Sequence, residues 1–184
     1  MIRVMKQLAK DGATGIHPSY YATAPNIISR EKSILQEATG REVTFSRQHY
    51  IKVSLPATYR LLLQNNITDD FTMGYGSQLG FRAGTGSSFL WYDLTNECTT
   101  ALLLHPFCFM DTTAHYELGL SAHEAFEQLN DMNDILLKTG STMTTVFHNF
   151  SLGTAPEWAG WAPAYQSWLQ QLSGMKKAVM HDNR

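Results

Sequence analysis

The sequence has 184 residues, which is long enough for one domain with a hydrophobic core. Its net charge of −2 argues against a basic surface for nucleic acid or for an anionic membrane, and it leaves neutral ligands such as sugars open. The two cysteines, Cys98 and Cys108, form no disulfide framework, and Cys108 lies in the apolar run FCFM, where we expect a small buried side chain.

The amino-terminal residues do not have the pattern of a secretory signal peptide. Lys6 and Lys10 stand where the apolar region of such a peptide would be, and no apolar region follows them. No run of residues is apolar over the length that a membrane-spanning helix needs. We therefore expect a soluble, cytoplasmic protein with no membrane span.

In the first half of the chain, short apolar runs alternate with helical patterns. Apolar side chains recur at helical spacing from residue 2, and a glycine at position 12 is a suitable stop. The pattern predicts helices over residues 2–10, 28–40 and 56–66, with strands over 13–16 and 42–45 and a strand-like start at 67.

The second half continues the alternation. Residues 99–111 form one or two buried strands that are broken at Pro106. Ser121 and Glu124 form a capping box at the start of a helix that ends at Gly140. A β-branched strand follows over 141–147, then a last helix over 162–174 and a tail over 175–184. The alternation predicts an α/β protein with a mainly parallel sheet.

Several polar residues follow directly after predicted strands, where the carboxyl ends of parallel strands meet at one edge. In a parallel α/β barrel, side chains at such positions converge on the mouth that holds the active site. The residues are His17, His49, Asp70, Arg82, Asp111 and His148.

These residue types suggest metal-assisted hydrolysis. Imidazole nitrogen is a good ligand for zinc and related divalent ions, and a further histidine could protonate a leaving group. Arg82 could orient a carboxylate by a bidentate contact. Each residue also has a structural explanation, such as Asp111 as a helix cap or His17 as a turn residue. His105, His115 and His123 are expected to be structural or solvated, as is His181.

The segments GIHPSYY, SRQHY, FTMGYGSQLGFRAGT, FCFMD and FHNFS together resemble a bacterial branch of the polysaccharide deacetylase superfamily, the NodB-homology deacetylases. The resemblance covers about residues 10–165. It implies a distorted (β/α)7 barrel. It also implies a hydrolase that acts on carbon–nitrogen bonds and removes an N-acetyl group from a sugar or glycan with the help of a divalent metal, zinc above all.

The resemblance also assigns roles to residues. His17 and His49 correspond to the two metal-binding histidines, although His49 comes one strand later than in the usual pair. Arg82 corresponds to the arginine that orients the catalytic base, and His148 to the late histidine that acts as general acid. Asp111 is the candidate for the residue that tunes His148.

One departure from the family pattern concerns its first motif, an aspartate pair that supplies the general base and a metal ligand. This motif would precede residue 1, so we expect the barrel to lack its first strand and to be incomplete over residues 1–174. A longer enzyme of which this chain is a part and a truncated, inactive relative both fit this pattern. The alternative function is a non-catalytic carbohydrate-binding relative that uses Tyr20, Trp158 and Trp161 as stacking surfaces, although core packing is the other explanation for the two tryptophans.

Overall fold

The computed structural model describes residues 2–182, with side chains described through residue 174. The sequence predicts one domain over residues 1–174, and the structure groups the chain into two compact units. The first unit comprises Met1–Gly76 and Phe81–Phe107, and the second comprises Ser77–Gly80 and Cys108–Arg184. The segment Ser77–Gly80 belongs to the second unit, where the Gly80 amide donates to the carbonyl of Cys108 over 2.7 Å.

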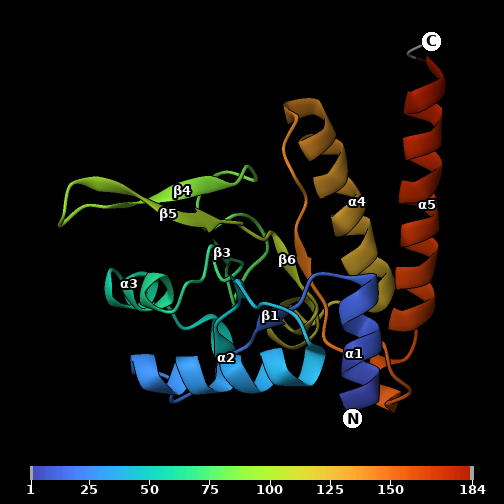
Figure 1. Ribbon diagram of the computed structural model, residues 1–184. Helices are drawn as coiled ribbons and strands as arrows, with labels where there is room; N and C mark the ends of the chain where they lie inside the picture. The colour runs from blue at the N-terminus through green and yellow to red at the C-terminus, as the bar shows by residue number, and fades with distance from the viewer. Residues whose placement is uncertain (1, 183–184) are drawn as a thin grey trace. The chain divides into compact units, whose positions relative to one another are not determined.

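The first unit is built on a five-stranded sheet with the order β1-β2-β3-β5-β4. The pairs β1–β2, β2–β3 and β3–β5 are parallel, and β4 pairs with β5 in antiparallel fashion. Figure 1 shows the long β4–β5 hairpin extending beyond the much shorter strands β1 and β3. The strands are β1 (Gly15–Ile16), β2 (Phe45–Ser46), β3 (Asp69–Asp70), β4 (Phe89–Asp93) and β5 (Cys98–Leu104).

Helices α2 and α3 cover the sheet of the first unit with apolar side chains. Ile28 of α2 and Leu62 of α3 are fully buried in one core with Leu102 of β5, and such burial is the main favourable term in folding. The parallel strands need crossover helices, which explains the alternation in the sequence. The helical elements of this unit are α1 (Ile2–Asp11), α2 (Pro25–Thr39), the short η1 (His49–Ile51) and α3 (Ala57–Gln64).

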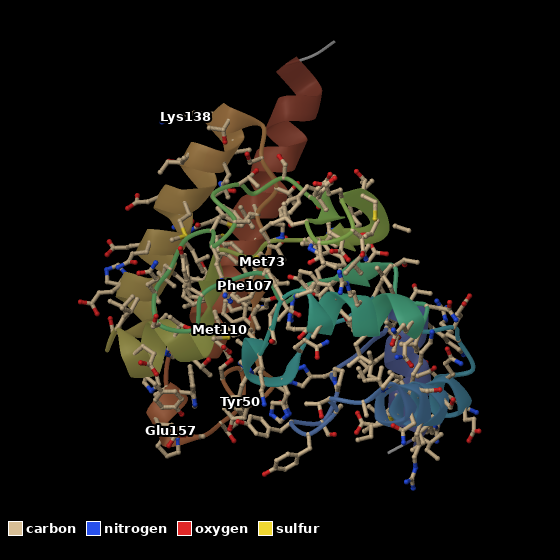
Figure 2. All side chains as sticks on the ribbon, turned by 90° about the vertical axis from the view of Figure 1, so that its left-hand side faces the viewer. Tyr50, Met73, Phe107, Met110, Lys138 and Glu157 are labelled. Carbon is tan, nitrogen blue, oxygen red and sulfur yellow. The ribbon has the colours of Figure 1, made fainter. Side chains whose placement is uncertain are left out.

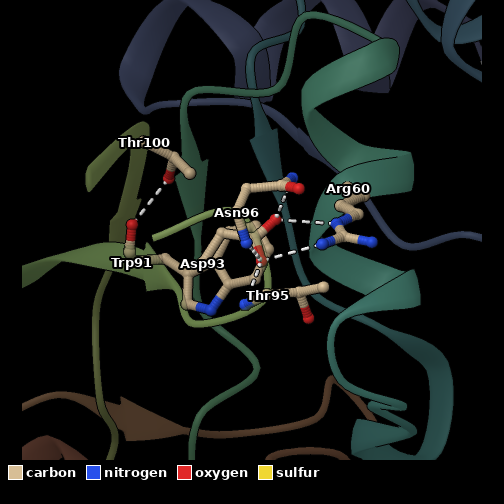
Figure 3. A network of polar contacts seen from close by, with 6 residues as sticks. All are labelled: Arg60, Trp91, Asp93, Thr95, Asn96 and Thr100. Atoms are coloured by element: carbon tan, nitrogen blue, oxygen red, sulfur yellow. Dashed lines mark hydrogen bonds and ion pairs between the residues drawn. The ribbon is translucent and has the colours of Figure 1, made fainter. Parts of the chain in front are cut away.

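The end of β4 is tied to α3 by a carboxylate (Figure 3). Asp93 accepts hydrogen bonds from Nε and Nη2 of Arg60 over 2.7 and 2.8 Å, and from Nδ2 of Asn96 over 3.0 Å in the turn to β5. The hydrogen bond from Arg60 lowers the pKa of Asp93. β4 itself is not predicted from the sequence, because its continuous apolar run has no alternation and follows a loop rich in glycine and serine.

The second unit has a two-stranded parallel sheet, β6 (Phe109–Met110) and β7 (Thr145–Val146). Its main helix, α4 (Ala122–Thr139), has the predicted capping box: Ser121 Oγ accepts from the Glu124 amide, and the Glu124 carboxylate accepts from the Ser121 amide over 2.9 Å. The remaining elements are the π-helical turn η2 (Thr113–Glu117), the 3-10 turn η3 (Pro156–Trp158) and α5 (Trp161–Asp182), which packs against α4.

The predicted α/β class and mainly parallel sheet are confirmed. The strands of the described residues form two open sheets and no closed barrel. For the predicted tail over 175–184, the backbone of α5 is helical through Asp182, and the last two residues lie outside the described part of the chain. Within residues 2–182, no helix combines the length and the apolar character that crossing a membrane requires.

Candidate functional site

Two histidines follow the carboxyl ends of neighbouring parallel strands in the first unit. β1 ends at Ile16 and is followed by His17, and β2 ends at Ser46 and is followed three residues later by His49. The register pairs Ile16 with Ser46, so the two side chains leave the sheet at one edge. Their ring centroids are 4.9 Å apart. The sequence-based expectation that His17 and His49 lie together therefore agrees with the geometry.

The ring of His17 is oriented by a backbone carbonyl. Its Nδ1 lies 2.7 Å from the carbonyl oxygen of Arg47, an acceptor, so Nδ1 carries the hydrogen and Nε2 has the lone pair. Metal-binding histidines commonly donate their other ring N–H to a carbonyl in this way, which fixes their tautomer. The Arg47 carbonyl is itself held in place, because the Arg47 amide donates to Ile16 over 3.0 Å and its Nε donates to Phe71 over 3.1 Å.

A buried carboxyl group supports the loop that carries His49. Asp70 has no exposed surface and accepts from Ser46 Oγ over 2.6 Å and from Thr72 Oγ1 over 2.8 Å. Thr72 Oγ1 in turn accepts from the Gln48 amide over 3.0 Å. Burial raises the pKa of Asp70, although the hydrogen bonds from Ser46 and Thr72 lower it in part. The sequence places Asp70 among the site candidates, and the structure gives it a supporting position.

Exposed tyrosines surround His49. The ring of Tyr50 stacks on His49 with centroids 4.8 Å apart, and Tyr20 meets Tyr50 edge to face at 5.7 Å. With Tyr21 and Lys52 they line an open pocket of about 660 Å³. Tyr50 has a left-handed backbone with φ of 54° and a side chain that is 75% exposed, and it is labelled in Figure 2. Flat, exposed aromatic rings of this kind can stack on a sugar, as predicted for Tyr20.

A carboxylate–histidine pair occupies the corresponding position in the second unit. β6 ends at Met110 and is followed by Asp111, and β7 ends at Val146 and is followed two residues later by His148. The register pairs Met110 with Val146, and Nδ1 of His148 lies 2.6 Å from Oδ1 of Asp111. Asp111 is thus in direct contact with the ring of His148, as its expected role beside that histidine requires.

Asp111 is held as an ionised acceptor. Its carboxylate has no exposed surface and accepts from the His148 amide over 2.6 Å and from the Thr112 amide over 2.7 Å. Burial alone would raise the pKa of Asp111, but the hydrogen bonds from the ring and the amide of His148 outweigh it, and the net pKa is lowered. An ionised Asp111 requires a hydrogen on Nδ1 of His148, so Nε2 is the nitrogen that can exchange a proton with a ligand. The His148 side chain is 36% exposed.

Trp158 and Trp161 do not form stacking surfaces for a ligand, which corrects the sequence-based expectation. Both indoles are 1% exposed. They pack against each other with centroids 5.0 Å apart, and His115 lies 4.4 Å from the Trp158 ring. These tryptophans are core residues of the second unit, because large aromatic side chains gain most when their whole surface leaves water.

Arg82 lies exposed in the loop before β4. Its charge acts on Tyr59 of α3: burial and the charge of Asp70 raise the pKa of that phenol, and Arg82 opposes the rise. Its predicted role in orienting a catalytic base stays a prediction.

The donor set of the first unit fits a divalent metal ion in part. Two imidazoles lie side by side, and one has its tautomer fixed by a carbonyl, as a zinc ligand requires. In the described part of the chain, however, no group of three histidine, cysteine, aspartate or glutamate side chains is close enough to hold a metal. His17 and His49 can therefore supply two ligands of a metal site, and the described residues supply no third of these types.

Sequence reasoning missed three residues that shape the site. Ser151 donates to the His148 carbonyl, the Arg47 carbonyl orients His17, and Tyr50 stacks on His49. All three lie within the segments SRQHY and FHNFS, where the sequence assigns a role only to the histidine. Their roles depend on backbone turns, which residue type alone does not specify.

Comparisons with known proteins identify the fold. Neither a known protein family nor a curated protein matches the sequence. A protein assigned as a polysaccharide deacetylase from Mycobacterium smegmatis has a similar structure, with a TM-score of 0.66 and 15% identity over 93% of this chain and 60% of that one. A second one so assigned, from Pseudomonas aeruginosa PAO1, has a TM-score of 0.64 and 18% identity over 94% and 57%.

The structure of PuuE allantoinase is similar too, with a TM-score of 0.64 and 16% identity over 94% of this chain and 57% of that one. The chain thus spans about 60% of the length of these structures and has the fold of the polysaccharide deacetylases. The expected fold class is confirmed.

Proposed function

We propose that this chain carries hydrolase machinery for a carbon–nitrogen bond, of the kind that removes an N-acetyl group from a sugar or glycan. The observation that carries the proposal is the Asp111–His148 pair, with 2.6 Å between Oδ1 and Nδ1 at the carboxyl ends of paired parallel strands. In open α/β sheets this edge is where ligands bind. The fold shared with polysaccharide deacetylases and with an allantoinase supports the same reaction class.

In this proposal His148 is the general acid. Its Nε2–H protonates the amine that leaves when the amide breaks, and buried, ionised Asp111 stabilises the imidazolium before that transfer. Such a positioned acid contributes about 100- to 10,000-fold in rate. The side chain needs solvent access to reach a substrate, and its 36% exposure provides it.

His17 and His49 would hold a divalent metal ion, for which zinc fits the imidazole donors. When bound, such an ion polarises the carbonyl and lowers the pKa of a bound water. Arg82 is proposed to orient the base. Tyr20, with Tyr50, is proposed to stack on the sugar in the open pocket beside His49.

A non-catalytic carbohydrate-binding role is the second candidate. The exposed tyrosine pocket favours it, as does the absence of a third metal-binding side chain among residues 2–182. The hydrolase requires His148 for acetate release, whereas a carbohydrate-binding protein requires only the tyrosines for glycan binding.

Zinc titration calorimetry, followed by acetate release from N-acetylated chitooligosaccharides, tests the proposal. We expect zinc binding by the wild-type chain, its loss in the His17→Ala/His49→Ala double variant, and full zinc binding with loss of acetate release in His148→Ala. Unchanged zinc affinity in the double variant would refute the metal site. Glycan binding that needs Tyr20 but neither zinc nor His148, without acetate release, would establish the binding role instead.

A further inference from the structure

Three side chains of the first unit form a hydrogen-bonded chain that the proposed deacetylase site does not use. Nδ1 of His105 lies 2.8 Å from Oγ of Ser88, and Nε2 of His105 lies 2.7 Å from Oδ1 of Asp69. The hydroxyl of a possible nucleophile therefore contacts a base, and the base contacts a carboxylate that can orient it. This arrangement is the structural signature of nucleophilic catalysis, and it is recognised by geometry rather than by order along the chain.

The sheet brings these residues together from three strands. Ser88 directly precedes β4 and His105 directly follows β5, and the register pairs their neighbours Phe89 and Leu104. Asp69 of β3 lies opposite Leu103 of β5, which places its carboxylate beside His105. The β4–β5 hairpin and β3 are adjacent in Figure 1. Asp69 lies in a strand and the other two residues directly flank paired strands, so the register of the sheet sets the positions of all three.

The hydrogens on His105 have one consistent assignment. An ionised Asp69 only accepts, so Nε2 carries the hydrogen, and in the neutral ring Nδ1 is then the lone pair that accepts from the Ser88 hydroxyl. Phe71 stacks flat on the imidazole, with centroids 4.3 Å apart and an interplanar angle of 7°. Thr68 Oγ1 donates to Oδ2 of Asp69 over 2.7 Å, so both carboxylate oxygens have partners.

The triad is accessible to a ligand. Ser88 is exposed, and the side chains of His105 and Asp69 keep 21% and 20% of their surface. A nucleophile must reach its substrate, so its hydroxyl has to be accessible from solvent. The open position of Ser88 is therefore what a catalytic serine requires.

We propose that Ser88, His105 and Asp69 form a second, metal-independent hydrolytic site for carboxylic esters. In the first step the Ser88 hydroxyl gives its proton to Nδ1 of His105, and Oγ bonds to the ester carbonyl carbon. The carbon–oxygen bond to the leaving alcohol then breaks, and the alcohol takes the proton from Nδ1. Water, deprotonated by Nδ1, hydrolyses the acyl-serine, which releases the carboxylic acid and returns the proton to Ser88.

Esters are the substrate class that this geometry fits best. The protonated Nδ1 that activated the serine can also protonate the leaving alcohol oxygen. An ester is cleaved more readily than an amide, because an alkoxide is a better leaving group than an amide nitrogen. The proposal does not rest on the deacetylase function, because none of its three groups is among the predicted metal ligands.

Labelling with a biotinylated fluorophosphonate, mapped by peptide mass spectrometry, tests the site. We expect one label per chain on Ser88, unaffected by EDTA. Ser88→Ala should lose the label, and Ser87→Ala, which alters the neighbouring exposed serine, should keep it. His105→Gln should slow labelling about 100- to 10,000-fold, as loss of a positioned base does, and Asp69→Asn should slow it as well.

A second readout covers variants that fail to fold. The wild-type chain should release a burst of one equivalent of p-nitrophenol from p-nitrophenyl acetate in EDTA, as an acyl-serine intermediate requires. Folded wild-type chain without label and without a burst would overturn the proposal. So would labelling of Ser88 at an unchanged rate in folded His105→Gln. Neither result would bear on zinc binding by His17 and His49.

Discussion

Replacing Asp111 by asparagine should destabilise the second unit strongly. The carboxylate accepts hydrogen bonds from the His148 amide, the His148 ring and the Thr112 amide, and it has no exposed surface. Asparagine keeps one carbonyl oxygen. With that oxygen at the Oδ1 position, its NH2 group faces the His148 amide, which then has no acceptor. With the oxygen at the Oδ2 position, the Thr112 amide and the His148 ring have no acceptor.

The size of the loss follows from these contacts. A buried donor without an acceptor costs about 1–3 kcal/mol, and each hydrogen bond to a charged group contributes about 1.5–3 kcal/mol. Breaking a buried network of this kind costs about 3–5 kcal/mol, and for a chain of this length each kcal/mol corresponds to about 2–4 °C in melting temperature. Asp111→Asn should therefore lower the melting temperature by about 6–20 °C. Ser151→Ala, which removes the hydroxyl that donates to the His148 carbonyl over 2.7 Å, should cost about 1 kcal/mol.

The pH dependence has a definite sign. The pKa of Asp111 is lower in the folded chain than the usual carboxyl value, so its stabilising effect is present above that usual value, near pH 4, and disappears as the pH falls through the lowered pKa. The difference between wild type and Asp111→Asn should be largest at pH 7 and shrink below about pH 4. Urea unfolding, followed by tryptophan fluorescence and circular dichroism, measures it. A difference below about 1 kcal/mol at pH 7 would refute the reasoning.

Two further substitutions test other parts of the first unit. The pKa of Asp70 is raised by burial, so the fold favours its protonated form, and its contribution is greatest below about pH 4 and is lost as the pH rises through the raised pKa. Asp70→Asn cannot ionise, so its stability in urea relative to wild type should be higher at pH 7 than at pH 3.5; a relative stability that is equal at both pH values would contradict the raised pKa. Gly74→Ala would place Cβ 2.2 Å from the ring of Phe107, a residue labelled in Figure 2, and should cost about 1–3 kcal/mol. Gly174→Ala in α5 meets nothing within 4 Å and should be neutral or stabilising by about 0.5–1 kcal/mol; equal melting temperatures for the two alanine variants would contradict the packing argument.

The sequence alone determined the class of the fold and the local signals. Alternating apolar runs and helical patterns required a parallel sheet, and the Ser121–Glu124 capping box fixed the start of α4. The placement of His17, His49, Asp111 and His148 after strands also followed from the sequence, because a strand end is a local feature. Register then makes neighbouring strand ends meet.

Only the tertiary structure decided which of these side chains touch and which are buried. The sequence offered Trp158 and Trp161 as ligand surfaces, and packing against His115 buried them. It set His105 aside as structural or solvated, yet the register of three strands placed it between Ser88 and Asp69. The physical reason is that periodicity and capping act within a few residues, whereas burial and hydrogen-bond partners are set by pairing between segments far apart in the chain.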